Sequence, residues 1–162
     1  MPKPKIPLWN QMSPAERKGA ADFARRMANL AEEVEENIND GLKEISAVAL
    51  TEIVYQTPVD RRKNAPHPGQ ARGGWVVGAN TPPVPREPGH MDEVGTDTIA
   101  EGIAELTTLY GHNNTVFIEN HVPYINKLNA GSSQQAPAGF VEKALVQARS
   151  RFGTFVFKRR SG

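Results

Sequence analysis

The fold of this chain is decided by residues 13–57, which read SPAERKGAADFARRMANLAEEVEENINDGLKEISAVALTEIVYQT. Ser13 can cap a helix, Pro14 suits the first helical turn, and Glu16 completes a capping box. Apolar residues then recur at steps of three and four, which places them on one face of a helix. They are Phe23, Met27, Leu30, Val34, Ile38, Leu42, Ile45, Ala49 and Ile53. The stretch therefore predicts a long amphipathic helix that begins at Ser13.

The end and the length of this helix lead to a second prediction. The helix ends at Thr57-Pro58, because proline disfavours helical geometry in the residue before it. As a straight helix, residues 22–56 would span roughly 52 Å, whereas a compact globule of 162 residues is about 39 Å across. The helix therefore either kinks near Asn39-Asp40-Gly41 or projects from the body. A projecting helix would expose part of its apolar face, and exposed apolar surface usually marks a partner site.

The opposite face of the helix is charged. It carries Glu32, Glu33, Glu36, Asp40, Lys43 and Glu44. Charged residues gathered on one face are typical of a helix surface that is exposed to solvent, and we interpret them in this way.

Downstream of the long helix, short strands alternate with shorter helices. Residues 74–78 (GWVVG) and 115–119 (TVFIE) favour strands, because they are rich in β-branched and aromatic residues. The triplet Thr96-Asp97-Thr98 can cap a helix that stops at Gly111. The expected buried residues of this helix are Ile99, Ile103, Leu106 and Leu109. A last helix from Pro137 or Ala138 is expected to bury Phe140, Val141, Leu145 and Ala148.

These elements predict an α+β fold, in which the long N-terminal helix packs on a small, mostly antiparallel sheet with two further helices. With 162 residues, of which 38% are hydrophobic, the chain can bury one core but not two. We therefore expect a single domain over residues 13–151, preceded by an extended arm, residues 1–12, and followed by a basic tail, residues 152–162. Loops 58–74 and 80–97 are rich in turn residues and proline and are expected to be mobile.

Composition and charge exclude several classes of protein. The net charge is +1, from 19 basic and 18 acidic side chains, so no global field would hold nucleic acid. Cysteine is absent, which excludes disulfides, thiolate metal ligands and cysteine nucleophiles and is compatible with a reducing cytoplasm. No signal peptide and no apolar run of membrane-spanning length is visible, so we expect neither classical export nor a membrane partner.

No motif for catalysis is found in the sequence. It contains no nucleophile elbow of the Gly-x-Ser-x-Gly type, no phosphate loop and no dinucleotide fingerprint. The four histidines, at positions 67, 90, 112 and 121, lack the spacing of a metal site. We therefore expect no enzyme activity, no catalytic residue, no cofactor and no bound metal. A small metal-dependent hydrolase stays open as a hypothesis that requires His112, Glu119 and His121 to converge.

The C-terminal basic segment is the one feature that favours nucleic-acid binding. Its cations are the candidate DNA-facing residues, namely Arg149, Arg151, Lys158, Arg159 and Arg160. Phenylalanines at positions 152, 155 and 157 alternate with them and can stack on bases. The other interpretation is a packed edge strand at Phe155-Val156-Phe157 followed by a solubilising tail. A nucleic-acid-binding accessory protein is therefore the alternative function.

A series of small motifs follows the long helix in a fixed order. Thr57-Pro58-Val59-Asp60 comes first, and Ala71-Arg72-Gly73-Gly74-Trp75 then opens a strand. Next come residues 116–120 (VFIEN), Val122-Pro123-Tyr124, Leu128 and Gly131, and residues 133–141 (SQQAPAGFV) open the last helix. In their order and spacing these motifs, which cover about residues 22–150, resemble the tail-completion and neck proteins of long-tailed bacteriophages, of the lambda minor tail protein Z type. The sequence departs from that pattern by an insertion at residues 61–70 and by His121, where a second asparagine is common.

The resemblance implies a structural virion protein and not an enzyme. Such a subunit would form a homo-oligomeric ring, a hexamer, that joins the phage tail to the head. Its partners would be the head connector and the tail tube or terminator proteins, with phage DNA passing through the lumen without sequence-specific binding. It would be located in the neck of the virion, and in the host cytoplasm during assembly.

The matched motifs supply the candidate structural and interface residues. They are Pro58, Asp60, Arg72, Gly73, Gly74, Trp75, Pro123, Tyr124, Gly131, Gln134, Gln135 and Pro137. Burying Trp75 would remove about 200 Å² from water, at most roughly 5 kcal/mol, so we predict that it belongs to the core. Gly73 and Gly74 are expected to let the strand pass close to the long helix. Residues 133–137 (SQQAP) either cap the last helix or meet a neighbouring subunit, and both interpretations stay open.

Overall fold

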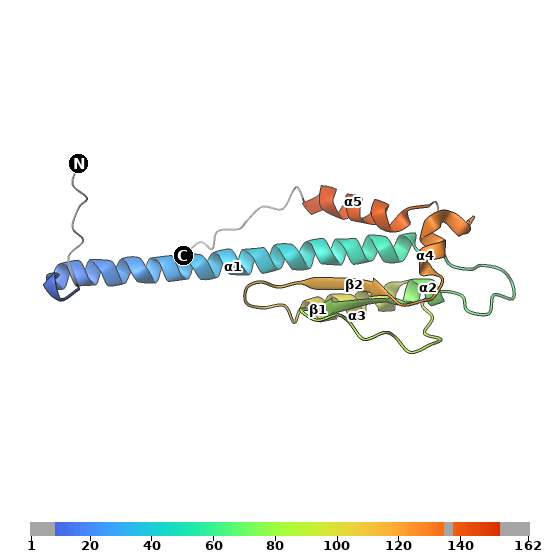
Figure 1. Ribbon diagram of the computed structural model, residues 1–162, viewed down its shortest axis with the longest axis horizontal. Coiled ribbons are helices and arrows are strands. Elements are labelled where there is room, and N and C mark those ends of the chain that lie inside the picture. The colour runs from blue at the N-terminus through green and yellow to red at the C-terminus, as the bar shows by residue number, and fades with distance from the viewer. Residues whose placement is uncertain (1–8, 135–137, 153–162) are drawn as a thin grey trace.

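The structure is a computed structural model that describes residues 9–134 and 138–152, and a single long helix dominates it (Figure 1). This helix, α1 (Pro14–Gln56), is 43 residues long. A short 3-10 turn, Trp9–Gln11, precedes it where the sequence predicted a wholly extended arm. Residues 1–8 of that predicted arm lie outside the described residues. The α+β class is confirmed, with a long N-terminal helix, an antiparallel sheet and further helices.

Helix α1 begins and ends where local signals predicted. The Ser13 hydroxyl accepts a hydrogen bond from the Glu16 backbone N–H at 3.3 Å, and the Glu16 carboxylate accepts one from the Ser13 N–H at 2.7 Å. The Thr57 N–H donates to the carbonyl of Ile53 at 3.0 Å, and the helix stops there. Between these caps α1 continues through Gly41 without a break, so of the two predicted alternatives the helix projects.

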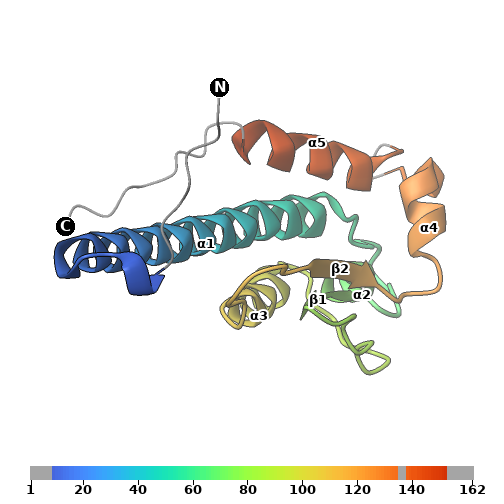
Figure 2. The same cartoon turned by 60° about the vertical axis from the view of Figure 1, so that its left-hand side comes forward.

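The remaining elements pack around the C-terminal half of α1 (Figures 1 and 2). In chain order they are α2 (Gln70–Gly73), β1 (Trp75–Ala79), α3 (Thr96–Leu106), β2 (Val116–Asn120), α4 (Ile125–Lys127), a helical turn at Leu128–Ser132 and α5 (Phe140–Phe152). Strands β1 and β2 pair antiparallel with Val77 opposite Ile118. In both views the sheet and α3 lie on one side of α1, and α5 lies on the other.

The hydrophobic core forms between these two layers and the C-terminal half of α1. Its buried members are Leu50, Ile53, Val54, Ala71, Trp75, Val77, Leu106, Leu109, Ile125, Phe140 and Ala144. The apolar residues that α1 buries are Ala49, Leu50, Ile53 and Val54, all within its last two turns. None of the helices formed by the described residues has an apolar stretch of membrane-spanning length.

Helix α3 differs from the prediction in its cap, its buried face and its end. Its N-cap is Gly95, with a φ of 90°, and not the triplet Thr96-Asp97-Thr98. Ile103 was expected to be buried but is 42% exposed, because Gly102 is the residue that faces the core. The helix ends at Leu106, before the predicted stop at Gly111.

Helix α5 also differs from the prediction. It begins at Phe140 and not at residue 137 or 138, and it packs on α1 through Phe140, Ala144 and Ala148. Leu145, predicted to be buried, is 51% exposed. The helix continues to Phe152, the residue at which the predicted basic tail begins. The rest of the predicted tail, residues 153–162, lies outside the described residues.

Gly102 makes the close packing of α3 on α1 testable. A Cβ at this position would overlap Leu50 Cδ2 and lie 2.8 Å from Val77 Cγ2. We expect Gly102→Val to lower the free energy of unfolding by about 1–3 kcal/mol, the usual effect of overpacking. Urea unfolding measures it, with the exposed Ala104→Val of the same helix as the control. Equal midpoints for the two variants would contradict the prediction.

Candidate assembly surface and its anchor

The N-terminal part of α1 extends beyond the rest of the described chain (Figure 1). We define residues 14–38 as the projecting half of α1. None of its side chains is buried. The described elements that pack on α1 lie along its other half, on both sides (Figure 2). The projecting half is therefore open to an additional partner.

The projecting half carries five large apolar side chains at helical spacing, which we call the apolar stripe. The stripe consists of Phe23 (59% exposed), Met27 (49%), Leu30 (51%), Val34 (47%) and Ile38 (56%). Complete burial of one such side chain contributes about 1.5–3 kcal/mol, so covering the exposed half contributes about 1 kcal/mol. Two copies burying ten such side chains would gain about 10 kcal/mol, against an association cost of about 4–15 kcal/mol. The gain is thus of the same size as the cost, which is the balance expected for association of modest affinity at most.

Charge is unevenly distributed along the same segment. Residues 14–26 contain four basic and two acidic side chains, a net charge of +2. Residues 27–40 contain five acidic side chains and no basic one, a net charge of −5. The segments around the two ends of the stripe therefore carry net charges of opposite sign.

Trp75 anchors the body to the C-terminal end of α1. It is 6% exposed, as predicted for a core residue, and its Nε1–H donates to the Thr57 hydroxyl at 2.8 Å. That hydroxyl donates in turn to the Ile53 carbonyl at 2.7 Å. The Thr57-Pro58 motif therefore ends the helix and also satisfies the buried indole.

Arg72 caps the C-terminus of α1 from outside the helix. Its guanidinium donates to the carbonyls of Thr57 at 2.9 Å, Tyr55 at 3.2 Å and Glu93 at 2.7 Å. Helix C-termini leave carbonyls without intrahelical partners, and a cation there also complements the helix dipole. Burial of the guanidinium lowers the pKa of Arg72 from its usual value. The residue thus ties the loop before α3 to the end of α1.

Asp92 supplies the cap that α3 lacks in its own sequence. Its carboxylate accepts hydrogen bonds from the Gly95 N–H at 2.6 Å, the Thr98 N–H at 2.9 Å and the Thr98 hydroxyl at 2.8 Å. Burial alone would raise the pKa of this carboxyl, but the hydrogen bonds from Thr98 and Gly95 outweigh it and hold the pKa below its usual value.

The lowered pKa of Asp92 predicts a pH dependence of stability. Because the folded-state pKa lies below the unfolded value of about 3.9, the stabilisation is complete above that pH and is lost as pH falls through the folded pKa. We expect Asp92→Asn to be less stable than the natural chain by a constant amount between about pH 5 and 8, with the difference shrinking below about pH 4. Urea unfolding across this range measures it. A difference that stays constant down to pH 2 would contradict the prediction.

Gly73 and Gly74 make close approaches, but not to the long helix as predicted. A Cβ on Gly73 would lie 2.9 Å from the backbone N of Asp92, and a Cβ on Gly74 would lie 2.6 Å from Val122 Cγ2. The two glycines therefore seat the Asp92 loop and the segment after β2. The prediction that these glycines let β1 pass close to α1 is therefore wrong.

Several predicted interface residues meet in a cleft at the C-terminal end of α1. The cleft has a volume of about 680 Å³, and Pro58, Asp60, Gln70, Tyr124 and Gln134 are among the residues that line it. Asp60 accepts hydrogen bonds from the backbone N–H and the guanidinium of Arg62, and the Arg62 side chain lowers the pKa of Asp60 to about 2. The Tyr124 hydroxyl donates to Gln70 at 3.0 Å. The cleft is open to solvent and its lining mixes polar and apolar side chains, which suits contact with a protein surface.

Two further motif residues that the structure describes, Pro123 and Gly131, do not line this cleft. Pro123 is exposed and comes directly before Tyr124 in the chain. Gly131 has a φ of 92° and lies next to Ala138. Gln135 and Pro137 lie outside the described residues. The Asn129 carboxamide instead accepts the Val141 N–H at 3.0 Å and donates to Glu142, which holds the entry to α5.

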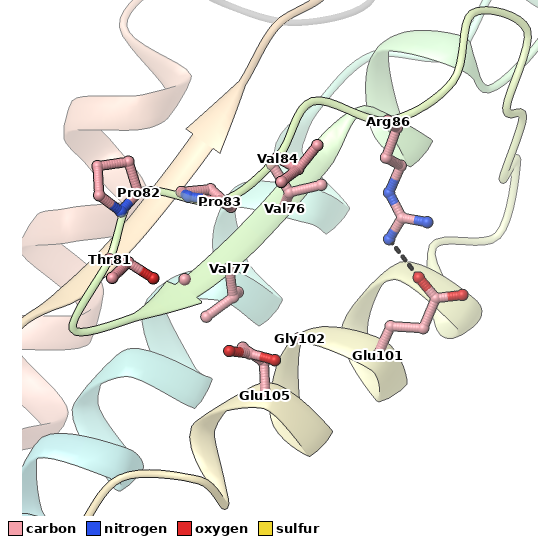
Figure 3. Close-up of a pocket in the computed structure, with 11 residues that line it drawn as sticks. Val76, Val77, Thr81, Pro82, Pro83, Val84, Arg86, Glu101, Gly102 and Glu105 are labelled. Atoms are coloured by element: carbon pink, nitrogen blue, oxygen red, sulfur yellow. Dashed lines mark ion pairs between the residues drawn. The ribbon is translucent and has the colours of Figure 1, made fainter.

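A second cleft, of about 430 Å³, lies between β1, α3 and residues 81–86 (Figure 3). Arg86 reaches across it to an ion pair with Glu101 and also approaches the Trp75 carbonyl at 3.4 Å. Gly78 lies beneath Pro83, where a Cβ would come within 2.8 Å of the proline nitrogen. Sequence reasoning missed Arg86, because a single arginine in a proline-rich segment carries no periodic signal.

The basic and histidine candidates do not gather into a site within the described residues. Arg149 is exposed, Arg151 pairs with Glu52 at 2.8 Å, and the candidates at 158–160 lie outside the described residues. His112 lies 3.8 Å from Glu35, whereas His121 lies 3.1 Å from Glu119. The convergence that the metal-dependent hydrolase requires is therefore not found, and residues 9–134 and 138–152 form no cluster of metal ligands.

Comparisons of the chain with family models, with curated protein sequences and with solved structures find no match.

Proposed function

We propose that this protein is a structural virion subunit, which assembles with copies of itself into the ring that completes a phage tail and joins it to the head. The observation that carries the proposal is the apolar stripe on the projecting half of α1, half-exposed in the isolated chain. A contiguous apolar surface of this kind usually marks an interaction site. The order of the motifs between Thr57 and Val141, which resembles tail-completion proteins, supports the assignment to phage.

The polar motif residues support a scaffold in place of a catalyst. Trp75 is bonded to Thr57, Arg72 to the carbonyls at the end of α1, and Asp92 to the start of α3. Each of these contacts fixes one segment of the chain to another. Trp75 and Arg72, which the resemblance singles out, and Asp92, which it does not, thus hold the body on α1 and leave the projecting half exposed.

Ring formation requires one surface of a subunit to meet a different surface of the next subunit. The cleft at the C-terminal end of α1 is a candidate for one of these two surfaces, whereas the apolar stripe is a candidate for self-association. Loops 58–74 and 80–97, together with the terminal segments, are the candidates to contact the head connector and the tail tube or terminator proteins. A hexamer with DNA in its lumen is the form that the resemblance favours.

Labelled electron microscopy of purified virus particles tests the proposal. An antibody against this chain should decorate the junction between head and tail. Particles in which tails form but stay separate from heads are expected when the gene is disrupted. Intact, infectious particles that lack the protein would overturn the proposal, as would turnover of a substrate by the purified chain.

The alternative function is nucleic-acid binding through the basic C-terminal segment. It has less support, because Arg151 is engaged with Glu52. Binding of the intact protein to DNA at low salt, abolished when the five candidate cations are replaced by serine, would favour this alternative. No binding at low salt would remove it.

A further inference from the structure

We infer that the partner of the apolar stripe is the same stripe of a second copy, packed antiparallel around a two-fold axis near Leu30. The inference rests on the proposed self-association and specifies its first contact. A two-fold contact closes after two copies. The pair is therefore the building unit, and closure of a ring is left to other surfaces such as the cleft at the C-terminal end of α1.

The spacing of the stripe is nearly symmetric about its centre. Phe23 and Ile38 lie seven and eight residues from Leu30, and Met27 and Val34 lie three and four residues from it. Reversing one helix against another therefore places Phe23 opposite Ile38, Met27 opposite Val34, and Leu30 opposite itself. Steps of three and four residues are the spacing by which paired helices interdigitate.

The residues beside the stripe favour close approach of the two helices. Ala20, Ala24 and Ala31 follow one edge of it at steps of four and seven, so this edge is lined by small side chains. Arg26 and Glu33 follow the other edge, seven residues apart. In the antiparallel pair Arg26 of one copy approaches Glu33 of the other, and the two-fold axis repeats this contact.

Charge selects the antiparallel direction over the parallel one. In a parallel pair, residues 27–40 of the two copies would lie side by side and bring a net charge of −5 against −5. In the antiparallel pair centred near Leu30, residues 14–26, with a net charge of +2, face residues 34–46 of the other copy, with a net charge of −3, and only residues 27–33, with a net charge of −2, face each other. Opposite charges across an interface fix its register and direction, whereas like charges suppress the wrong arrangement.

Cysteine cross-linking tests the pairing directly, because the natural chain contains no cysteine. Leu30→Cys should form a disulfide-linked dimer on oxidation. Met27→Cys and Val34→Cys, each alone, should cross-link poorly, because like positions are offset by about 10 Å along the axis, beyond disulfide reach. When the two variants are mixed, with one of them carrying a mass tag, the cross-linked dimer of Met27→Cys with Val34→Cys should form in at least tenfold greater yield than the cross-linked dimer of either variant with itself. Val146→Cys, 68% exposed on α5, controls for random collision.

The outcomes separate this inference from the proposed function. Efficient self-cross-linking of Met27→Cys and of Val34→Cys would show a parallel pair and overturn the inference. No cross-link in any variant, with oligomers present by light scattering, would overturn the pairing while self-assembly stands. A chain that stays monomeric at all concentrations would count against both. If the full chain is monomeric but a chain ending at Phe152 dimerises, residues 153–162 cover the stripe and the inference is wrong.

Discussion

Replacing Trp75 by alanine should lower the free energy of unfolding by about 3–5 kcal/mol, the range for large aromatic residues removed from a core. The indole is 6% exposed and also supplies the hydrogen bond to Thr57. Total stabilities of single domains are about 5–15 kcal/mol, so a loss of this size would leave the body marginally folded. Urea unfolding followed by circular dichroism measures it.

Two further variants separate the contributions of Trp75. Trp75→Phe keeps most of the apolar contact but removes the donor to Thr57, and we expect a smaller loss of about 1–2 kcal/mol. Tyr110→Ala, at a position 83% exposed, is the control for removing an aromatic ring and should have little effect. If Trp75→Ala unfolds at the same urea concentration as Tyr110→Ala, Trp75 does not anchor the body to α1.

The double variant Met27→Glu, Leu30→Glu should weaken self-association about 100-fold or more. In each copy it removes two apolar contacts of about 1 kcal/mol and places carboxylates beside an acidic segment, and each 1.4 kcal/mol changes the dissociation constant tenfold. Stability of the body should stay unchanged, because neither side chain is buried. Light scattering over a range of concentrations measures the association, and urea unfolding measures the stability.

A matched control carries the same added charge on the other side of the helix. Ala21→Glu, Asn29→Glu also adds two carboxylates to the projecting half, at exposed positions away from the stripe. We expect it to associate much as the natural chain does. Equal weakening by both double variants would mean that net charge and not the apolar stripe controls association.

Local signals in the sequence predicted α1 and the two strands well. The capping box at Ser13 and the proline after Thr57 fixed both ends of α1, since each acts through neighbouring residues. The two strands were placed to within one residue by their β-branched and aromatic content. The length of the helix left two alternatives, a kink near Gly41 or projection from the body, and the unbroken α1 of the structure shows projection.

The contacts that bury one face of a helix could not be predicted in the same way. Ile103 and Leu145 lie on apolar faces in the sequence, yet the faces that pack contain Gly102 and Ala144. Close approach of two helices requires small residues, and which face approaches depends on the partner and not on hydropathy. Asp92 was missed as a cap because it lies four residues before α3 in a segment predicted to be mobile.

The sequence predicted one part of the candidate site, the apolar stripe, but not the contacts that anchor the body to α1. The apolar stripe was visible as a helical period and needed only the structure to show that it is exposed. The role of Arg72 was not visible, because its carbonyl partners at Tyr55 and Thr57 lie on a different element. A single sequence indicates which residues are apolar at regular spacing, but not which carbonyls a distant guanidinium will reach.

The continuity of α1 also has a mechanical consequence. As an unbroken helix of 43 residues, α1 is about 64 Å long. Its last turns are clamped by Trp75 and Arg72, so the helix turns with the body as a lever. A tilt of the body by about 5° would carry the far end of a lever of this length through about 6 Å. A small rotation of the body around its core is thereby amplified at the N-terminal end of α1. Any partner bound there would be displaced by more than the length of one helical turn.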